Sequence, residues 1–323
     1  MDKRRLGTTD IKITPLGLGC WQFLQGSGIA SGFWPVLDDG LITEIIQVSL
    51  AGGMNWFDTA EAYGWGASER ALARALVRLG KQPGDVVIAT KWQPAGRFAG
   101  SIRSTIGQRL ECLAPFPIDL HQVHNPASFS GNTSQMEAMA DLLDAGLIRA
   151  VGVSNYLAGE MHRADYALRR RGYRLVANQV KYSLLDRRIE DNGVLAAAKE
   201  LGVTIIAYSP LEQGLLTGKF HENPELISQR PGPRRLLPKF QRRGLARSKP
   251  LIDLLRSIAE AHGATPAQVA LNWVVTAHGD TVVAIPGATK KHHAEQNVGA
   301  LGFTLTANEI QALDDVSRQV TAK

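Results

Sequence analysis

Three ionisable side chains stand at the ends of short apolar runs, and a tyrosine follows the first of them. Asp58, Lys91 and His124 each end such a run, and Tyr63 lies shortly after Asp58. A buried ammonium and a buried carboxylate pair, because either charge alone is costly in a low dielectric. A phenol beside this pair would experience the ammonium, which lowers its pKa from about 10 and eases proton transfer. A neighbouring histidine would donate to an oxygen that becomes negative.

These residue types suit the reduction of a carbonyl group, because they provide a proton donor and a hydrogen-bond donor that holds the carbonyl oxygen. They lack only a hydride source. Taken alone, the stretch around Asp58 and Tyr63 is equally consistent with a strand end that has a capping aspartate and a packed tyrosine. Lys91 as the Schiff base of a barrel aldolase is a further alternative, which trapping with borohydride would reveal. Cys20 has no base beside it, and no cluster of residues has metal-ligand spacing, so we expect no nucleophilic cysteine and no metal site.

Eight short apolar runs recur along the chain, and a helical pattern follows each of them. β-Branched residues in Val86–Ile88 and Thr204–Ile206 favour strands over helices. The runs are Leu16–Cys20, Met54–Asp58, Val86–Lys91, Asp119–His124, Ala150–Ser154, Val176–Tyr182, Thr204–Ser209 and Val282–Pro286. Strands that alternate with helices indicate parallel β/α units, and eight such units close most naturally into a (β/α)8 TIM barrel. The expected fold class is therefore α/β, with an open doubly wound sheet as the alternative.

Start and stop signals place helices between these runs. The expected helices are Thr43–Leu50, Ser68–Leu76, Ser134–Ala145, Gly193–Leu201, Pro250–His262, Thr265–Thr276 and Thr306–Val320, the last with a capping box from Thr306 to Glu309. Arg4–Leu6 and Ile11–Thr14 are expected to pair as an N-terminal β-hairpin across the bottom of the barrel. Leu211–Lys249 is expected to be a long loop after strand 7, followed by extra C-terminal helices. No linker divides the chain, so residues 1–323 are expected to form one domain.

Polar or small groups end every expected strand from the second to the eighth. They are Asp58, Lys91, His124, Ser154–Asn155, Gln179, Tyr208–Ser209 and Gly287. In a barrel of this kind the loops at the C-terminal strand ends converge, and chemistry collects there. Seven such groups on one rim are hard to explain by core packing, so the sequence predicts a functional site at this end.

The net charge of +6, from 36 basic and 30 acidic residues, comes from one segment. Eight basic residues and no acidic residue lie between Arg230 and Lys249, and without these eight the net charge would be −2. The segment has a single aromatic residue, Phe240, so it lacks the stacking platform of a nucleic-acid site. We expect a lid over an anionic cofactor, with a solvated loop as the alternative, and no nucleic-acid partner.

Composition favours a cytoplasmic protein. No apolar run approaches the roughly 18 residues that a membrane span needs. The basic residues Lys3–Arg5 precede no apolar region of the kind that signal peptides carry. Cys20 and Cys112 are the only cysteines, which suits a reducing compartment. We therefore expect no membrane partner.

Motifs along almost the whole chain resemble the aldo-keto reductase superfamily. They are Asp58–Gly64, Lys91, His124, Gly152–Asn155, Asn178–Gln179, Tyr208–Leu211 with Gly214–Lys219, and Ile285–Thr289. They occur in family order at matching strand ends, from about Leu6 to the C-terminus. The resemblance looks closest to the bacterial and potassium-channel-β-subunit-like branches, which share the stretch Ser-Pro-Leu…Gly-Leu-Leu-Thr-Gly-Lys.

The resemblance implies a role for each of the four ionisable residues. Tyr63 would be the general acid that protonates the carbonyl oxygen, and His124 would orient that carbonyl. Lys91 would lower the pKa of Tyr63, with Asp58 holding Lys91 in place. The implied activity is hydride transfer from NADPH to an aldehyde, ketone or sugar-type carbonyl. The alternative is a regulatory subunit that binds the dinucleotide with little turnover, which the intact set of four residues disfavours.

The resemblance also implies a dinucleotide site along the rim. The residues that match those holding the nicotinamide are Ser154, Asn155, Gln179 and Tyr208, the last as the ring on which it stacks. The residues that would line the pyrophosphate are Ser209, Leu211 and Gly214, with Lys219 as a charge partner. The residues that match the adenine-binding positions are Gln296 and Asn297.

The end of strand 8 departs from part of the family. Some members place a lysine after the Ile-Pro pair and an arginine in the next helix on the ribose 2′-phosphate, whereas this chain has Gly287 and His293 there. Thr289 and Lys290 could still bind that phosphate, Lys290 as a point charge. The implied cofactor is NADPH, with NADH left open.

Aromatic residues near the rim indicate where a substrate binds. Trp21, Trp34 and Trp92 are expected to wall the pocket, although ordinary aromatic packing would explain each of them about as well. The expected partner is a small-molecule carbonyl or alcohol substrate.

Overall fold

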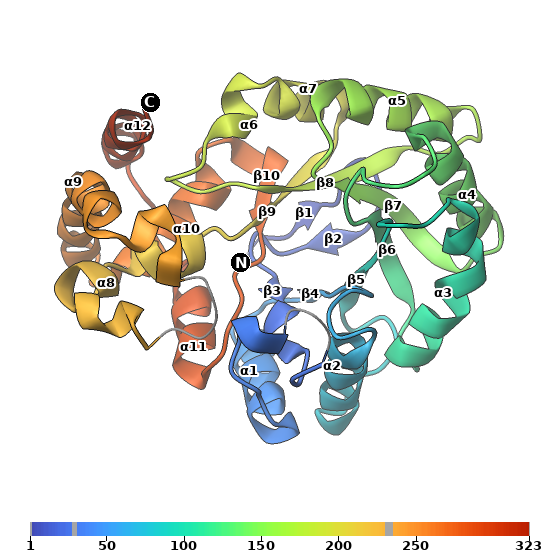
Figure 1. Cartoon of the computed structure of the whole chain (residues 1–323), viewed down its shortest axis with the longest axis horizontal. Coiled ribbons are helices and arrows are strands. Elements are labelled where there is room, and N and C mark those ends of the chain that lie inside the picture. The colour runs from blue at the N-terminus through green and yellow to red at the C-terminus, as the bar shows by residue number, and fades with distance from the viewer. Residues whose placement is uncertain (1, 28–30, 230–234, 323) are drawn as a thin grey trace.

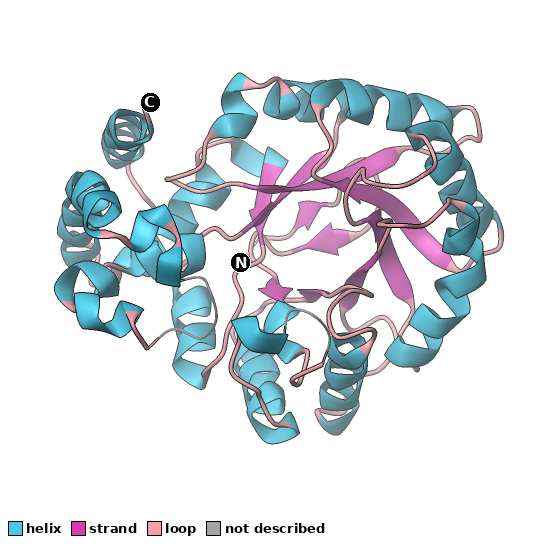
Figure 2. Ribbon diagram, viewed as in Figure 1, coloured by secondary structure: helices cyan, strands magenta, loops and turns pink. Residues whose placement is uncertain are grey.

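The computed structural model describes residues 2–27, 31–229 and 235–322, and its central element is a parallel sheet that curls into a barrel (Figures 1 and 2). Within these residues the sheet has eight strands, in the order β10-β9-β8-β7-β6-β5-β4-β3. They are β3 (Leu18–Gly19), β4 (Trp56–Asp58), β5 (Val87–Trp92), β6 (Ile118–Val123), β7 (Ile148–Ser154), β8 (Leu175–Lys181), β9 (Thr204–Tyr208) and β10 (Val282–Ala284). Each strand overlaps one of the eight predicted apolar runs.

The barrel closes between β3 and β10. The backbone N–H of Gly17 donates to the carbonyl of Ala284 (2.9 Å). The backbone N–H of Gly19 donates to the carbonyl of Pro286 (3.1 Å). A Cβ on Gly19 would lie 2.8 Å from the carbonyl oxygen of Ile285, so this close approach of two strands needs a glycine. The predicted (β/α)8 TIM barrel is confirmed, and the open doubly wound sheet is excluded.

The predicted N-terminal hairpin covers one end of the barrel. β1 (Arg4–Arg5) pairs antiparallel with β2 (Lys12–Ile13). Ile13 of β2, with Leu6 and Ile11 next to the two strands, is buried, and all three are at most 4% exposed. They pack against side chains inside the barrel, namely Trp56, Ala89, Leu120, Ala150, Val176, Ala177, Ile206, Val283 and Ile285. Apolar side chains fill this end, so the polar strand ends gather at the opposite rim.

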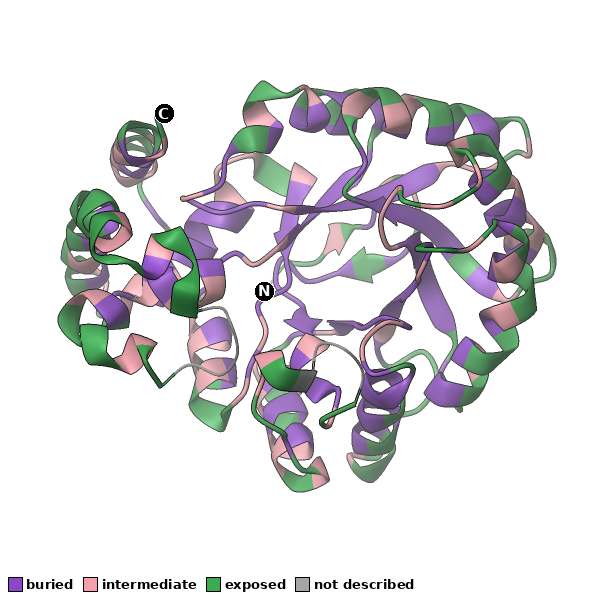
Figure 3. Cartoon of the chain, viewed as in Figure 1, coloured by how far each residue is buried: buried purple, intermediate pink, exposed green. Residues whose placement is uncertain are grey.

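Helices surround the sheet, with buried residues on their inner faces and exposed residues outside (Figure 3). They include α1 (Asp39–Ala51), α2 (Ala67–Arg78), α3 (Gly100–Leu113), α4 (Asn132–Asp144), α5 (Ala158–Arg169), α6 (Arg188–Asp191), α7 (Val194–Leu201), α10 (Pro266–Thr276) and α11 (Lys291–Gly299). The side chains of Asp38 and Thr265 accept from backbone N–H groups at the starts of α1 and α10. Among the described helices, none is both long and apolar enough to cross a bilayer.

The segment after β9 differs from the predicted loop. It contains the short helical turns η3 (Glu212–Thr217), α8 (Lys219–Glu222), η4 (Pro224–Ile227) and η6 (Pro238–Phe240). α9 spans Arg242–Ala261, so it begins before the predicted start at Pro250. Pro250 lacks a backbone N–H, but the complete burial of Leu251 and Leu255 on this helix offsets the lost hydrogen bond. Arg230 and Arg234 of the basic segment lie outside the described residues.

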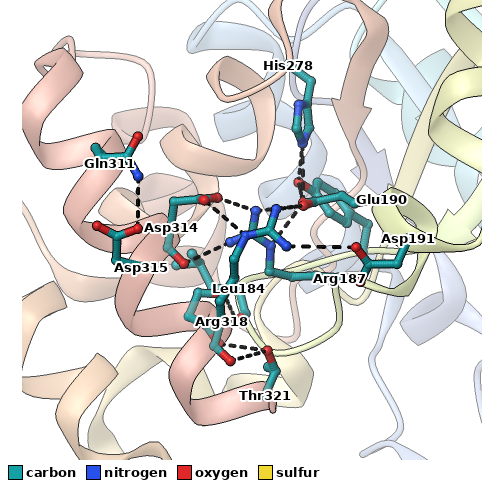
Figure 4. A network of polar contacts seen from close by, with 12 residues as sticks. Leu184, Arg187, Glu190, Asp191, His278, Gln311, Asp314, Asp315, Arg318 and Thr321 are labelled. Carbon is teal, nitrogen blue, oxygen red and sulfur yellow. Dashed lines mark hydrogen bonds and ion pairs between the residues drawn. The ribbon is translucent and has the colours of Figure 1, made fainter.

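Charged side chains fasten the C-terminal helix α12 (Ala307–Thr321) to the barrel (Figure 4). Arg187, which is 5% exposed, pairs with Glu190 (2.7 Å) and with Asp314 of α12. Arg318 of α12 reaches the same Glu190 (2.8 Å). Although burial opposes it, hydrogen bonds from His278 and Arg187 hold the pKa of Glu190 at about 2. The predicted capping box at the start of α12 is confirmed.

Candidate active site

A buried ion pair lies where β4 and β5 end. The Lys91 Nζ donates to Asp58 Oδ1 (2.5 Å) and to the carbonyl of Thr59 (2.8 Å), and both charged side chains are at most 1% exposed. Thr90 points outward, to Glu69 of α2 (2.6 Å), so strand alternation turns Lys91 into the barrel. Burial disfavours the ammonium, but the attraction of Asp58 outweighs it, and the pKa of Lys91 lies above its usual 10.5.

Tyr63 lies beside this pair, on the turn between β4 and α2. Its hydroxyl is 3.4 Å from Lys91 Nζ, which also stands 5.0 Å from the centre of its ring. The sequence predicted that the ammonium would lower the pKa of Tyr63, and Lys91 does act in this direction, but burial outweighs it. Burial of the phenol raises its pKa above the usual 10, and Lys91 opposes this only in part. Tyr63 therefore keeps its proton at neutral pH.

His124 completes this group from the end of β6. Its ring stands edge-on to that of Tyr63, with centres 5.7 Å apart at 78°. Burial, aided by the charge of Lys91, lowers the pKa of His124 to about 3. Its Nδ1 is buried and has no hydrogen-bond partner within the described residues. The imidazole is thus neutral and has hydrogen-bonding capacity left for a ligand.

A chain of polar contacts continues along the rim from β7 to β9. Ser154 donates to the carbonyl of Gln179 (2.9 Å), and the amide of Asn155 donates to Ser154 Oγ (3.0 Å). The Tyr208 hydroxyl donates to Asn155 Oδ1 (3.0 Å). The structure thus brings together the four residues that the sequence assigned to a nicotinamide.

Two glutamine amides donate to the second oxygen of Asp58. Gln179 Nε2 lies 2.8 Å from Asp58 Oδ2, and Gln122 Nε2 lies 3.1 Å from it. Gln122 was missed from the sequence, because one glutamine in an apolar strand does not reveal which way it faces. Only the fold shows that Gly152 leaves room for this side chain, since a Cβ there would lie 3.0 Å from Gln122 Cγ.

The loop after β9 has an unusual backbone. Ser209, Gln213 and Gly214 have φ of 53°, 60° and 89°, in the left-handed region. Left-handed residues beside right-handed ones turn successive N–H groups to one side, which makes an anion-binding concavity. A Cβ on Gly214 would lie 3.6 Å from Lys219 Cε, so this lysine stands over the loop, and Leu211 caps the first turn of η3. This arrangement fits the predicted pyrophosphate contact.

Glu212 on the same loop ties it to two other parts of the chain. Its carboxylate is 2% exposed and pairs with Lys181 at the end of β8 (2.7 Å). It also pairs with Lys239 of the basic segment (2.6 Å). The basic segment is therefore joined by an ion pair to the loop that the sequence assigned to the pyrophosphate.

The end of β10 and the start of α11 form the next part of the rim. A Cβ on Gly287 would lie 2.3 Å from Gln22 Nε2, so a larger residue there would displace the amide end of the Gln22 side chain. The backbone N–H and the hydroxyl of Thr289 both lie 3.2 Å from His293 Nδ1. Burial, with the charges of His292, Lys219 and Lys290, lowers the pKa of His293 to about 4. Lys219 and Lys290 thus stand near one neutral imidazole.

The two predicted adenine positions have different environments. Gln296 Oε1 accepts from the hydroxyl of Thr265 (2.5 Å). Asn297 is 2% exposed, and its Nδ2 has no partner within the described residues. Since an unpaired buried amide is costly, this free donor fits a bound group with acceptors, such as an adenine.

The predicted substrate pocket is only partly as expected. The Trp21 ring lies 6.2 Å from that of Tyr63 and 5.4 Å from that of Trp34, so Trp21 stands beside the phenol and Trp34 stands beside Trp21. Trp92 differs, because it is 1% exposed and its indole N–H donates to Ser101 (3.1 Å). It belongs to the core beneath the rim rather than to an open wall. Across the described residues, no group of His, Cys, Asp and Glu could hold a metal ion.

Known proteins are similar to this chain over almost its whole length. An oxidoreductase of Mycobacterium tuberculosis is 40% identical over 308 residues, which cover 95% of this chain and 90% of the relative. A chloroplastic pyridoxal reductase of Arabidopsis thaliana is 34% identical, over 96% of this chain and 84% of the relative.

Solved structures agree with these relatives. The glycerol dehydrogenase of Gluconobacter oxydans matches with a TM-score of 0.83 and 28% identity, over 100% of this chain and 97% of the other. A thermostable aldo-keto reductase in complex with the inhibitor epalrestat matches with a TM-score of 0.77 and 28% identity, over 98% and 100% of the two chains. The sequence model of the Aldo/keto reductase family matches residues 15–318. The chain belongs to the aldo/keto reductase family.

Proposed function

We propose that this oxidoreductase reduces aldehyde or ketone groups with NADPH and that Tyr63 is the general acid. The observation that carries the proposal is the placement of the Tyr63 hydroxyl 3.4 Å from the Nζ of a lysine that is itself paired with Asp58. The chemistry that a bound reduced nicotinamide would supply is a hydride to the carbonyl carbon. The chain itself supplies the proton, the electrostatic support and the binding groups.

Tyr63 donates its proton to the carbonyl oxygen as that oxygen becomes negative. Its raised pKa keeps the phenol protonated before the reaction, which is the state that an acid needs. Lys91 stabilises the phenolate that remains, because its ammonium lies next to the phenol oxygen. The neutral His124 donates a hydrogen bond to the same carbonyl oxygen and orients it.

The residues that would hold the dinucleotide are Ser154, Asn155, Gln179 and Tyr208 at the nicotinamide, Ser209, Leu211, Gly214 and Lys219 at the pyrophosphate, Gly287, Thr289 and Lys290 near the 2′-phosphate, and Gln296 and Asn297 at the adenine. The nearness of Lys219 and Lys290 to the site around Thr289 favours a phosphorylated ribose and hence NADPH over NADH. The unpaired amide of Asn297 supports an adenine at its position.

The aldolase alternative is disfavoured by the state of Lys91. A Schiff base requires a neutral amine, whereas Asp58 raises the pKa of Lys91 and keeps the ammonium charged. Lys91 is also completely buried, behind the phenol of Tyr63.

Dinucleotide oxidation should be measured across a panel of carbonyl compounds, with NADPH and NADH in parallel. Pyridoxal belongs in the panel, and glycerol should be tested in the oxidation direction with NADP+ and NAD+, since one relative is named a pyridoxal reductase and one solved structure a glycerol dehydrogenase. The Tyr63→Phe variant should lose about 100-fold or more in kcat, because general acid catalysis contributes about 10²–10⁴-fold. Its dissociation constant for NADPH should stay close to that of the wild type. Unchanged turnover in this variant would refute Tyr63 as the acid.

A further inference from the structure

Gln122 of β6 joins two parts of the candidate site. It is completely buried, and its Nε2 donates to Asp58 Oδ2 (3.1 Å). Its Oε1 lies 3.3 Å from Gln179 Nε2, which itself donates to Asp58 Oδ2 (2.8 Å). The carboxylate of the ion pair and the amide assigned to the nicotinamide therefore share one partner.

The barrel leaves space for this glutamine. Gln122 lies opposite Lys91 of β5 and Gly152 of β7 in the sheet register. A Cβ on Gly152 would lie 3.0 Å from Gln122 Cγ, closer than most such contacts, so a larger residue there would push the glutamine away. A polar side chain held this tightly in a barrel interior needs every hydrogen bond that it makes.

These contacts fix which end of the Gln179 amide faces outward. An amide has a donor end and an acceptor end, and its orientation follows from its partners. Both partners of Gln179 Nε2, Asp58 Oδ2 and Gln122 Oε1, are acceptors. Within the described residues, Gln179 Oε1 accepts no hydrogen bond, and it is the end left for a ligand.

We propose that Gln122 is a positioning residue that turns the oxygen of the Gln179 amide toward the dinucleotide site while it holds the Asp58 carboxylate. The inference rests on the proposed function, because it takes the nicotinamide carboxamide as the group that Gln179 binds. The carboxamide carries an NH2 donor, and an amide oxygen fixed toward it is its natural acceptor. Without Gln122, the Gln179 amide has one acceptor fewer to set its orientation, and Asp58 has one donor fewer.

The variant Gln122→Met tests both parts, because it keeps the length of the side chain and removes both polar atoms. NADPH binding, followed by tryptophan fluorescence without substrate, should weaken about tenfold, as expected for the loss of one well-oriented hydrogen bond. The kcat at saturating NADPH should fall as well, because the Asp58 carboxylate that holds Lys91 loses one of its two amide donors. The titratable groups that face Asp58 are Lys91 of β5, Tyr63 after β4 and Cys20 after β3, and all three are unchanged in the variant.

A second variant, Gln122→Glu, keeps the proposal testable if the first folds poorly. A protonated glutamic acid donates to Asp58 and accepts from Gln179, as glutamine does, whereas a glutamate repels Asp58. NADPH binding by this variant should approach that of the wild type near pH 6 and weaken as the pH rises. A role in packing alone would not produce this pH dependence.

Gln135→Met is the matched control. Gln135 is also completely buried and makes two hydrogen bonds, with Tyr156 (2.6 Å) and Ser130 (2.7 Å), away from Asp58. It should lower the melting temperature without changing NADPH affinity or kcat. If Gln122→Met behaved like this control, or if Gln122→Glu bound NADPH equally at all pH values, the inference would be overturned. A wild-type chain that binds NADPH but reduces no carbonyl compound would refute the proposed function. NADPH binding by the Gln122 variants and by the Gln135 control would then still test the role of Gln122.

Discussion

The ion pair of Asp58 and Lys91 makes Asp58→Asn a direct test of the electrostatics of the site. Both side chains are at most 1% exposed, and the variant keeps the size of Asp58 while it removes the charge. Breaking a buried pair by removing one partner costs about 3–5 kcal/mol, because the remaining charge is left unpaired. At an unfolding entropy of about 2.1 cal/mol/K per residue, the 323 residues should lose about 4–7 °C in melting temperature.

The pH dependence of stability gives a second readout. In the wild type, the pKa of Lys91 in the folded state lies above its usual 10.5. Its stabilisation is therefore fully present below that pH and is lost only as the pH rises through the folded value. In Asp58→Asn, burial is no longer opposed by Asp58, so the pKa of Lys91 should fall below that of the unfolded chain. The unfolded state then binds more protons, and the variant should gain stability as the pH rises from about 7 to about 10.

Thermal unfolding followed by circular dichroism, near neutral pH and near pH 9.5, measures both effects. Asp253→Asn is the control, since it breaks an exposed pair with Lys249 and should cost at most about 1 kcal/mol. The double variant Asp58→Asn, Lys91→Met should recover stability, because it leaves no unpaired charge. A melting temperature of Asp58→Asn equal to that of the control, with no gain at high pH, would refute the reasoning.

Three further predictions concern the cofactor and the proton. Lys290→Ala should weaken the binding of NADPH about tenfold and change the binding of NADH little, since a charge-assisted contact to the 2′-phosphate is lost. Equal weakening of both affinities in paired titrations would place that phosphate elsewhere. Lys239→Met breaks the 2.6 Å pair with Glu212 and, if the basic segment is a lid, should raise the NADPH dissociation rate in stopped-flow measurements about fivefold. An unaltered rate would favour a solvated loop. Because the pKa of Tyr63 lies above 10, steady-state carbonyl reduction should stay flat from about pH 7 to about pH 9, while alcohol oxidation, which needs the phenolate, should rise. A fall in reduction centred near neutral pH would indicate a different acid.

The sequence was sufficient to predict the barrel and to place the ionisable residues of the candidate site at its strand ends. Each strand is a short apolar run, and the residue that ends it on the rim is polar because it leaves the core there. This is why Asp58, Lys91 and His124 could be placed next to one another before their distances were known. The capping box at Thr306 was equally visible, because its two partners are close in sequence.

The parts that were missed depend on contacts between distant residues. Gln122 reaches Asp58 across 64 positions, and a single sequence carries no signal for such a contact. α9 continues through Pro250 because Leu251 and its neighbours bury a face against α10 and α12, so tertiary packing overrides the helix-breaking tendency of proline. The burial of Trp92 also depends on a distant element. Helix α3 carries Ser101, which accepts the hydrogen bond of the Trp92 indole N–H.

The balance of charges around Tyr63 connects these residues. Burial and Asp58 raise the pKa of the phenol, whereas Lys91 lowers it, and the first two prevail. The sequence could identify the ammonium, but the extent of burial that outweighs it exists only in the folded chain. The amide donors of Gln122 and Gln179 point at Asp58 Oδ2, so they partly compensate the negative charge that opposes loss of the proton. The two amides leave Asp58 Oδ1 free to pair with Lys91. This pairing keeps the ammonium beside the Tyr63 hydroxyl oxygen, which becomes negative when Tyr63 gives up its proton.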